Sequence, residues 1–310
     1  MMNPVLHRHL RSSVLRNRFF WLLSLYLLGF SILTLLFNSM FFVAPFLQSE
    51  SNLSMSGIYE QGQILYRSSS LLLLVVSIIL APVGALGSVS SEREHRTLDL
   101  LRVTTLRPRT IVLGKFLAVL ASGTLYLLSP LPLLIVGAWL GSISATEMIL
   151  TAGFLLTTLL FSTAQALFIS SLVRKTVAAV LLYYGLIVAT LPIAAILAFV
   201  LGALPSYLIY TEGLPPLPFW AVALLQHGWV LITGLHPISA AITTVALSID
   251  QGSWLLVEFY VSPTSLRTGS MASSGTIILP SPWIPFTLLA LAGTALLLWL
   301  TARRLGRPER

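Results

Sequence analysis

The chain has 310 residues, of which 56% are hydrophobic and only 9% are charged, and its mean hydropathy is +0.91. A soluble domain of this length needs far more surface charge, so the composition excludes that class. The absence of cysteine excludes disulfides, thiolate catalysis and cysteine-ligated zinc. Several runs of about 20 residues lack ionisable groups and suit helices across a hydrocarbon layer roughly 30 Å thick. We interpret the chain as an all-α polytopic membrane protein.

The distribution of charge predicts how the chain is oriented. The formal net charge is +8, and sixteen of the 18 Lys and Arg residues fall at the ends of apolar runs. A nucleic-acid surface gathers its basic residues on one soluble module, so we expect no nucleic-acid partner. Basic loops of membrane proteins face the cytosol. The charge pattern therefore indicates cytosolic loops, and it places both termini in the cytosol.

The N-terminal segment 1–18 alternates apolar and basic side chains at helical spacing, which is typical of a helix lying in the lipid headgroup layer. A frayed basic tail is the alternative. The apolar run that follows is long and lacks a small-x-small cleavage site, so we expect an uncleaved signal anchor.

Six spans are predicted from the apolar runs that follow. Their approximate ranges are 19–47, 68–89, 111–140, 148–173, 176–204 and 283–301. Spans 1–5 thus occupy residues 19–204, and the tail 302–310 lies in the cytosol. Prolines within spans 2, 3 and 5 are tolerated where neighbouring helices satisfy the freed carbonyls. The whole chain, 1–310, is expected to form one transmembrane domain.

Residues 205–282 are rich in proline and their charges are mostly acidic, which favours an outer loop. They include an apolar piece, 219–235, whose length is marginal for a span. If this piece crossed once, the basic tail would lie outside, against the charge rule. We therefore predict a re-entrant or interfacial hairpin on the outer side, before span 6.

The segment Ser90–Lys115 carries six basic and three acidic side chains between long apolar runs. Glu92 and Arg96 are spaced i,i+4 and the leucines nearby form an apolar edge, which predicts a short amphipathic helix over residues 92–101. A second helix is expected to start near Pro108. An ordinary solvated turn is the alternative at this point. We predict a cytosolic loop that contacts a partner.

The pattern Glu92–Leu101 (EREHRTLDLL), then Leu106-Arg107-Pro108 and Ile111–Lys115 (IVLGK), resembles the loop after the second span of ABC-2 type transporter permeases. Similar family runs are E-x-E-x-x-T-L-x-L-L, T-P-L and I-x-x-G-K. The N-terminal segment 3–11 and the six-span layout also resemble the family. Thr105 departs from it, because proline is usual there, and this change loosens the turn.

The resemblance implies that the loop is a coupling helix that inserts into a separate ABC ATP-binding subunit. It also implies a second permease chain, in a homodimer or a heterodimer, an exporter, and a bacterial or archaeal cytoplasmic membrane. Mixed charges in the loop would set partner choice and orientation. The residues expected to couple the two subunits are Glu92, Glu94, Arg96, Thr97, Leu98, Leu101 and Arg107.

The chain contains no G-x-x-x-x-G-K-[ST] run, because Gly114-Lys115 lacks the following hydroxyl and the upstream glycine. We therefore expect it not to be an enzyme, with ATP and Mg²⁺ bound by the partner and no cofactor or metal in this chain. Two alternatives stay open: an ion-coupled secondary carrier, and a membrane assembly or scaffold protein that transports nothing. A carrier normally needs an ionisable group in its spans, and none is predicted at mid-depth. The sequence does not identify a substrate.

Overall fold

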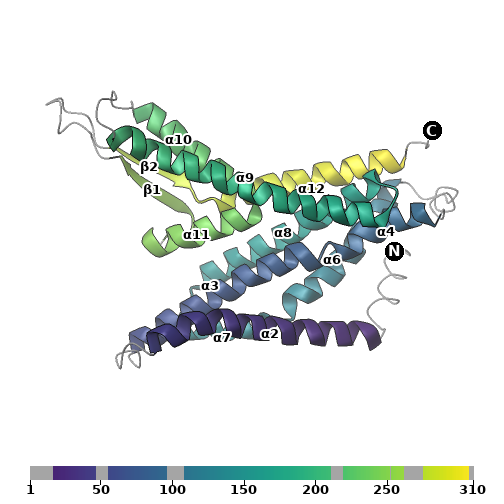
Figure 1. Ribbon diagram of the computed structural model, residues 1–310, viewed down its shortest axis with the longest axis horizontal. Helices are drawn as coiled ribbons and strands as arrows, with labels where there is room; N and C mark the ends of the chain where they lie inside the picture. Colours follow the sequence, from purple (N-terminus) through teal and green to yellow (C-terminus); the bar gives the residue numbers. More distant parts are fainter. Residues whose placement is uncertain are drawn as a thin grey trace. The chain divides into compact units, whose positions relative to one another are not determined.

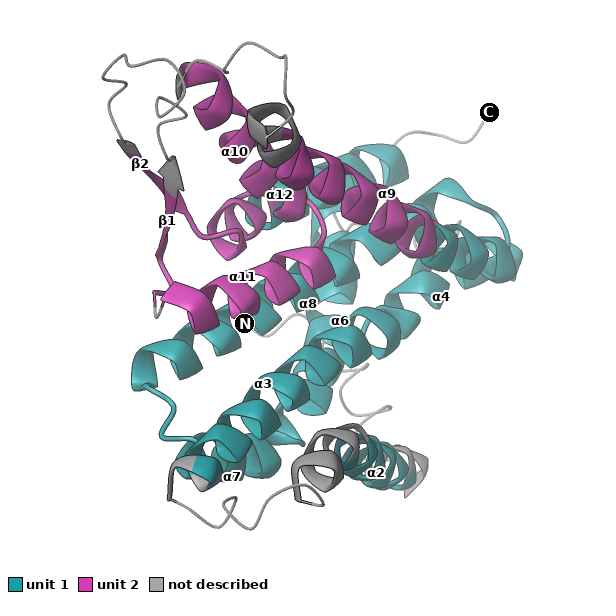
Figure 2. Cartoon of the chain, turned by 60° about the vertical axis from the view of Figure 1, so that its left-hand side comes forward, with its two compact units in different colours: residues 1–185, 290–310 teal, residues 186–289 magenta. Residues whose placement is uncertain are grey.

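The structure is a computed structural model that describes residues 17–46, 55–95, 108–210, 219–251, 253–261 and 275–306. These residues divide into two compact units (Figure 2), residues 1–185 with 290–310 and residues 186–289. The predicted interfacial helix lies almost wholly outside the described residues, as does the segment between residues 95 and 108. Each unit is described by itself.

Unit 1 is built of apolar helices. Its helices are α2 (Asn17–Phe46), α3 (Met55–Leu80), α4 (Val83–Glu94), α6 (Pro108–Leu128), α7 (Leu131–Leu140) and α8 (Ala145–Leu172), with the first turns of α9 (Thr176–Tyr210) and most of α12 (Trp283–Leu305). Helix α3 packs against α7 and α8, and α4 packs against α8 (Figure 1). The buried side chains of α8 include many hydroxyl and small residues, which let helices approach closely in a membrane.

Two predicted spans are each interrupted by a proline. The predicted span 68–89 is α3 and α4, separated at Ala81 and Pro82, and the predicted span 111–140 is α6 and α7, separated at Ser129 and Pro130. Helix α3 also begins at Met55, so the stretch up to Arg67, which the predicted spans leave out, is helical. A helix gains a backbone hydrogen bond with each added residue, so it continues through polar positions that a hydropathy pattern excludes.

The helices of unit 1 make close contacts at the far end of α3, away from α4. Gly62 and Gly141 bring the backbones of α3 and the α7–α8 turn together, and a Cβ on either glycine would overlap the other segment's backbone. Nearby, Arg67 of α3 pairs with Glu147 in the first turn of α8, with 3.3 Å between Nε and Oε1. Ser144 caps α8 by accepting a hydrogen bond from the Glu147 N–H.

Unit 2 contains an element that the sequence analysis did not predict, a two-stranded antiparallel sheet. Strand β1 (Leu256–Val261) pairs with β2 (Gly275–Pro280), and Val257 is opposite Leu279. Alternate residues of the strands face a small core formed with α10 (Phe219–Thr233). Within it, the Trp229 and Phe259 rings meet edge to face with their centroids 5.9 Å apart.

The apolar piece 219–235, predicted to be a hairpin on its own, corresponds to α10 and a tight turn that leads to α11 (Pro237–Gln251). Gln251 covers the edge of β1, because its side-chain amide both donates to the Glu258 carbonyl and accepts from the Glu258 N–H, each at 2.8 Å. The helix pair and the sheet therefore form one small module. Whether α10 enters the membrane stays a prediction.

Among the described residues, five helical segments are long and apolar enough to cross a membrane. They are Tyr59–Glu94, Pro108–Leu128, Ala145–Leu172, Thr176–Leu204 and Trp283–Leu305. In α2 the apolar stretch Leu23–Leu36 is shorter. The mostly helical polytopic class is confirmed, and the count of six spans stays a prediction.

Candidate functional site

The candidate site lies where the described part of the charged segment meets the end of α8, the start of α9 and the first half of α6. Helix α4 starts directly after Pro82, whose fixed φ of −76° suits a helix start. Its small residues allow close packing against α8, and Ala85, Val89 and Ser90 are fully buried. The last turn of α4 therefore presents Glu92, Arg93 and Glu94 beside the neighbouring helix ends.

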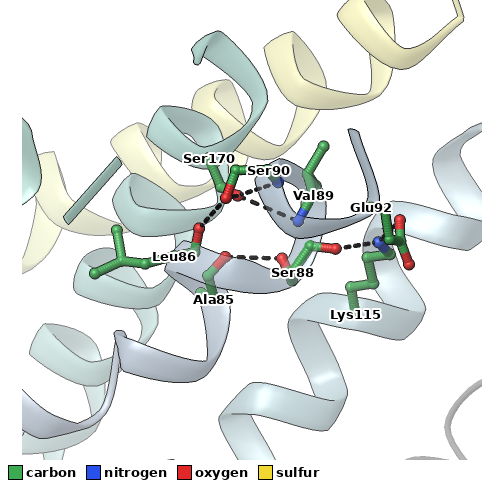
Figure 3. A network of polar contacts seen from close by, with 8 residues as sticks. All are labelled: Ala85, Leu86, Ser88, Val89, Ser90, Glu92, Lys115 and Ser170. Atoms are coloured by element: carbon green, nitrogen blue, oxygen red, sulfur yellow. Dashed lines mark hydrogen bonds and ion pairs between the residues drawn. The ribbon is translucent and has the colours of Figure 1, made fainter. Parts of the chain in front are cut away.

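A buried serine of α8, Ser170, forms hydrogen bonds with the last turns of α4 (Figure 3). Ser170 Oγ accepts hydrogen bonds from the backbone N–H groups of Val89 (3.2 Å) and Ser90 (3.0 Å), and it donates to Ser90 Oγ at 3.3 Å. Ser90 Oγ also lies 3.2 Å from Thr176 Oγ1 at the start of α9. Because these atoms are shielded from water, losing one partner would leave a buried polar group unsatisfied.

Glu92 connects α4 to α6. Its carboxylate forms an ion pair with the ammonium group of Lys115, which also donates to the Ser88 carbonyl (Figure 3). Lys115 is only 5% exposed although it lies in a helix apolar enough to span a membrane. A buried ammonium group is stable only when paired and hydrogen-bonded, so Glu92 is a structural partner of α6.

Arg93 connects α4 to the end of α8. Its Nη1 donates to the Ser171 carbonyl at 2.8 Å and lies 3.5 Å from the Val173 carbonyl. The last carbonyls of a helix have no partner inside the helix and carry partial negative charge. A guanidinium group at this position therefore satisfies the end of α8 and favours its direction electrostatically.

Glu94 connects α4 to the beginning of α9. Its Oε2 accepts hydrogen bonds from the Thr176 N–H (3.4 Å) and from Thr176 Oγ1 (3.2 Å). The first N–H groups of a helix are unpaired and favour a negative charge. A carboxylate of α4 thus acts as a cap for α9.

We call this set the helix junction: Ser88, Ser90, Glu92, Arg93, Glu94, Lys115, Ser170, Ser171 and Thr176. Three consecutive residues of α4 contact three different helices, and the segment 96–107 leaves α4 immediately afterwards. The charged side chains Glu92, Arg93 and Glu94 each bond to another helix, so the junction connects helices to one another. Within the described residues, no group of three or more histidines and carboxylates is placed to hold a metal ion.

Of the seven residues expected to contact a partner, two can be placed. Glu92 and Glu94 both bond within the chain, at the base of the loop. The remaining five, Arg96, Thr97, Leu98, Leu101 and Arg107, lie outside the described residues. Sequence reasoning missed Arg93, Ser170 and Thr176. Hydroxyl residues within spans and basic residues at the ends of spans are common in membrane proteins, and the sequence alone does not show which residues they will contact.

The basic ends of unit 1 lie close to the junction. Gly306, directly after α12, is near Pro108 at the start of α6. One turn earlier, the guanidinium carbon of Arg303 lies 5.3 Å from the centroid of the Trp299 ring. The turn Val173–Lys175 adds two exposed basic residues, Arg174 and Lys175. This end of unit 1 therefore gathers positive charge around the two ends of the loop.

Long apolar helices, with their charges gathered at a junction of helix ends, define a polytopic helical membrane protein. The sequence profile of the family described as ABC-2 family transporter protein matches residues 45–302. The chain belongs to this family of transporter membrane components. A search of curated proteins found no match. The resemblance noted in the loop motifs is thus confirmed at the level of the family.

Proposed function

We propose that the chain is the permease subunit of an ABC exporter, driven by a separate ATP-binding subunit. Membership of the ABC-2 family supports the permease class, since such membrane components generally work with an ATP-binding subunit. The observation that carries the mechanism is the bonding of Glu92, Arg93 and Glu94 to three different helices. Any displacement of the loop acts on α6, α8 and α9 together.

The coupling step follows from this geometry. The ATP-binding subunit, which holds ATP and Mg²⁺, closes on nucleotide and displaces the loop between α4 and α6. Because Lys115 and Glu92 are paired, the two helices that flank the loop move as one body. Arg93 and Glu94 then pass the displacement to the end of α8 and the start of α9. The assembly comprises two permease chains, identical or different, and two ATP-binding subunits.

The test uses two loop charges that are expected to contact the partner, Arg96 and Arg107, both of which lie outside the described residues. We expect Arg96→Glu with Arg107→Glu to reduce co-purification of the ATP-binding subunit by about tenfold, because complementary charges orient such contacts. Glu258→Lys is the control, since Glu258 is exposed on β1 in unit 2. If the loop variant retains its partner as well as the control does, the docking role is wrong.

One observation favours a second candidate, an ion-coupled carrier. Arg67 and Glu147 form an ion pair in which the carboxylate is buried and the arginine is partly buried, and both lie in helices that could span a membrane. Ionisable groups in spans often belong to ion pathways. Here, however, the carboxylate is in the first turn of its helix and is paired, which fits a structural contact better. Uptake into vesicles driven by an ion gradient without ATP would select the carrier.

A further inference from the structure

Three arginines close to the helix junction have no acidic partner among the described residues. Arg109 is in the first turn of α6, and Arg303 and Arg304 are in the last turn of α12. All three side chains are exposed. The ion pairs of the described residues involve other side chains, and Glu92 and Glu94 bond within the junction. No described carboxylate therefore balances the charge of the three arginines.

The helix ends that carry these arginines are adjacent. A Cβ atom on Gly306 would lie 3.5 Å from Cγ of Pro108. Arg109 directly follows Pro108, and Arg303 comes one turn before Gly306. A phosphate group has several acceptor oxygens, and the guanidinium fork matches their geometry. Arginines on two neighbouring helix ends are thus suited to bind one phosphate group.

An exposed stripe continues from Arg303 along α12. Trp299 and Leu296 lie one and two turns before Arg303, on the same face of the helix. Their side chains are 46% and 55% exposed. Long side chains of a helix lean toward its N-terminus, and Arg303 accordingly lies over the Trp299 ring in a cation–π contact. Guanidinium, indole and leucine therefore follow one another in the order of the headgroup, interfacial and hydrocarbon layers of a membrane leaflet.

Helix α6 has a stripe of the same kind. Arg109, Leu113 and Leu117 are spaced at i, i+4 and i+8, so they share a face, and all three are exposed. Both α6 and α12 are long and apolar enough to cross a membrane. Because their ends adjoin, both stripes have their arginine at the same end of unit 1 and their leucines within the span.

We propose that the adjoining ends of α6 and α12 bind an anionic phospholipid. The arginines bind its phosphate group, the Trp299 ring orients Arg303, and the exposed leucines contact the acyl chains. We call this surface the lipid site: Arg109, Leu113, Leu117, Leu296, Trp299, Arg303 and Arg304. The inference goes beyond the proposed function, because it needs neither an ATP-binding subunit nor a particular substrate.

A soluble protein is the rival occupant of an exposed basic surface. Such a protein can reach the arginines, but Leu117 and Leu296 lie about two turns further along helices that suit the hydrocarbon layer. In that layer an exposed leucine is surrounded by acyl chains. A phospholipid joins an anionic group to acyl chains in one molecule, so it complements both parts of each stripe. A soluble protein complements only the charged part.

The first experiment measures lipid binding to the purified chain in detergent by native mass spectrometry. Phosphatidylglycerol is the anionic probe, and phosphatidylcholine with the same acyl chains is the zwitterionic comparison. The unmodified chain should bind phosphatidylglycerol more tightly. Arg109→Gln with Arg303→Gln should weaken that binding about thirtyfold, the combined effect of two arginines near an anionic headgroup. Binding of phosphatidylcholine should change little.

The matched control removes the same charge elsewhere at this end of unit 1. Arg174→Gln with Lys175→Gln neutralises two exposed residues of the turn before α9, outside the lipid site. This variant should bind phosphatidylglycerol as the unmodified chain does. If it loses as much affinity as Arg109→Gln with Arg303→Gln, the lipid responds to overall charge and the assigned site is wrong.

The second experiment tests the indole and the apolar part of the stripes. Trp299→Leu keeps an apolar side chain but removes the ring beneath Arg303, and it should weaken phosphatidylglycerol binding about threefold. Glycerol 3-phosphate, which has the phosphate but no acyl chain, should not displace the bound lipid. Displacement by glycerol 3-phosphate at a similar concentration would show a simple anion site and overturn the lipid assignment.

Two further results would also overturn the proposal. Equal affinity for the two phospholipids would show that the arginines do not select the headgroup. If Arg109→Gln with Arg303→Gln keeps phosphatidylglycerol but loses the ATP-binding subunit in co-purification, the arginines contact that subunit instead. Because lipid binding is measured on the chain alone, a chain that recruits no ATP-binding subunit would contradict the proposed function and leave the lipid result intact.

Discussion

At the scale of single residues, Glu92 and Lys115 show that a charge expected from the sequence to contact a partner can instead form an ion pair within the chain. Glu92 was predicted to contact a partner subunit, yet its carboxylate pairs with an ammonium group that is almost completely buried. Reversing the charge of Glu92 alone would place two cations together at the base of the loop. A loss of partner binding in that variant would therefore not identify a direct contact.

A charge exchange separates the two roles of Glu92. We expect Glu92→Lys and Lys115→Glu each to lower the free energy of unfolding by about 3 kcal/mol, since each leaves a poorly solvated charge without its opposite. The double variant Glu92→Lys with Lys115→Glu should recover most of that loss, as measured by denaturant unfolding in detergent. It should also regain the ATP-binding subunit in co-purification. A stable double variant that still loses its partner would show that Glu92 contacts the partner directly.

At the scale of elements, the sequence predicts the apolar helices well and their interruptions poorly. The predicted range 148–173 differs from α8 by a few residues, because its hydropathy and the turns that bound it are local features. The break at Pro82 does not depend on local sequence alone. Whether a proline kinks or breaks a span depends on the hydrogen-bond donors that neighbouring helices supply to the freed carbonyls. Here the donors are tyrosines about 100 residues further along the chain.

The missed sheet has a similar cause. Strands β1 and β2 pair across a connection rich in small and polar residues, and their register is set by packing against α10. In the helix junction, likewise, the sequence indicated Glu92, Glu94 and the importance of the loop. It did not indicate which helix end each charge would meet, since the partners Ser171 and Thr176 become neighbours only on folding.

The turn between α10 and α11 provides a prediction about pH. His236 Nδ1 accepts a hydrogen bond from the Ile238 N–H at 3.2 Å, so the ring caps α11 in its neutral form. Burial lowers the pKa of His236 below its ordinary value of 6.5. The unfolded chain then binds a proton more readily, and the stability of unit 2 should fall as the pH drops below about 6.5.

His236→Asn is the control for this effect, because asparagine can accept the same hydrogen bond without titrating. Thermal unfolding followed by tryptophan fluorescence from pH 8 to pH 5 should show a decline in the unmodified chain that the variant lacks. Because His236 protonation is the proposed cause, an equal decline in both proteins would assign the pH dependence to other groups.

At the scale of the whole molecule, the positions of the charged helix ends support the predicted topology. The end of α4, the start of α6, the start of α9 and the end of α12 lie at one end of unit 1, since Glu94 contacts Thr176 and Gly306 is near Pro108. The opposite helix ends carry Glu60 and Glu147. Basic helix ends on one side and acidic ones on the other follow the charge rule, which favours a cytosolic loop.

Cysteine labelling tests this topology directly, because the unmodified chain has no thiol to remove. In intact cells a membrane-impermeant maleimide should label Glu258→Cys on β1, which is exposed, and should leave Arg174→Cys unlabelled. Opening the membrane should make Arg174→Cys react as well, since its side chain is exposed in the turn before α9. If both positions react in intact cells, α9 and the segments around it are oriented differently. The loop would then lie outside the cell, away from ATP, and the proposed coupling could not operate.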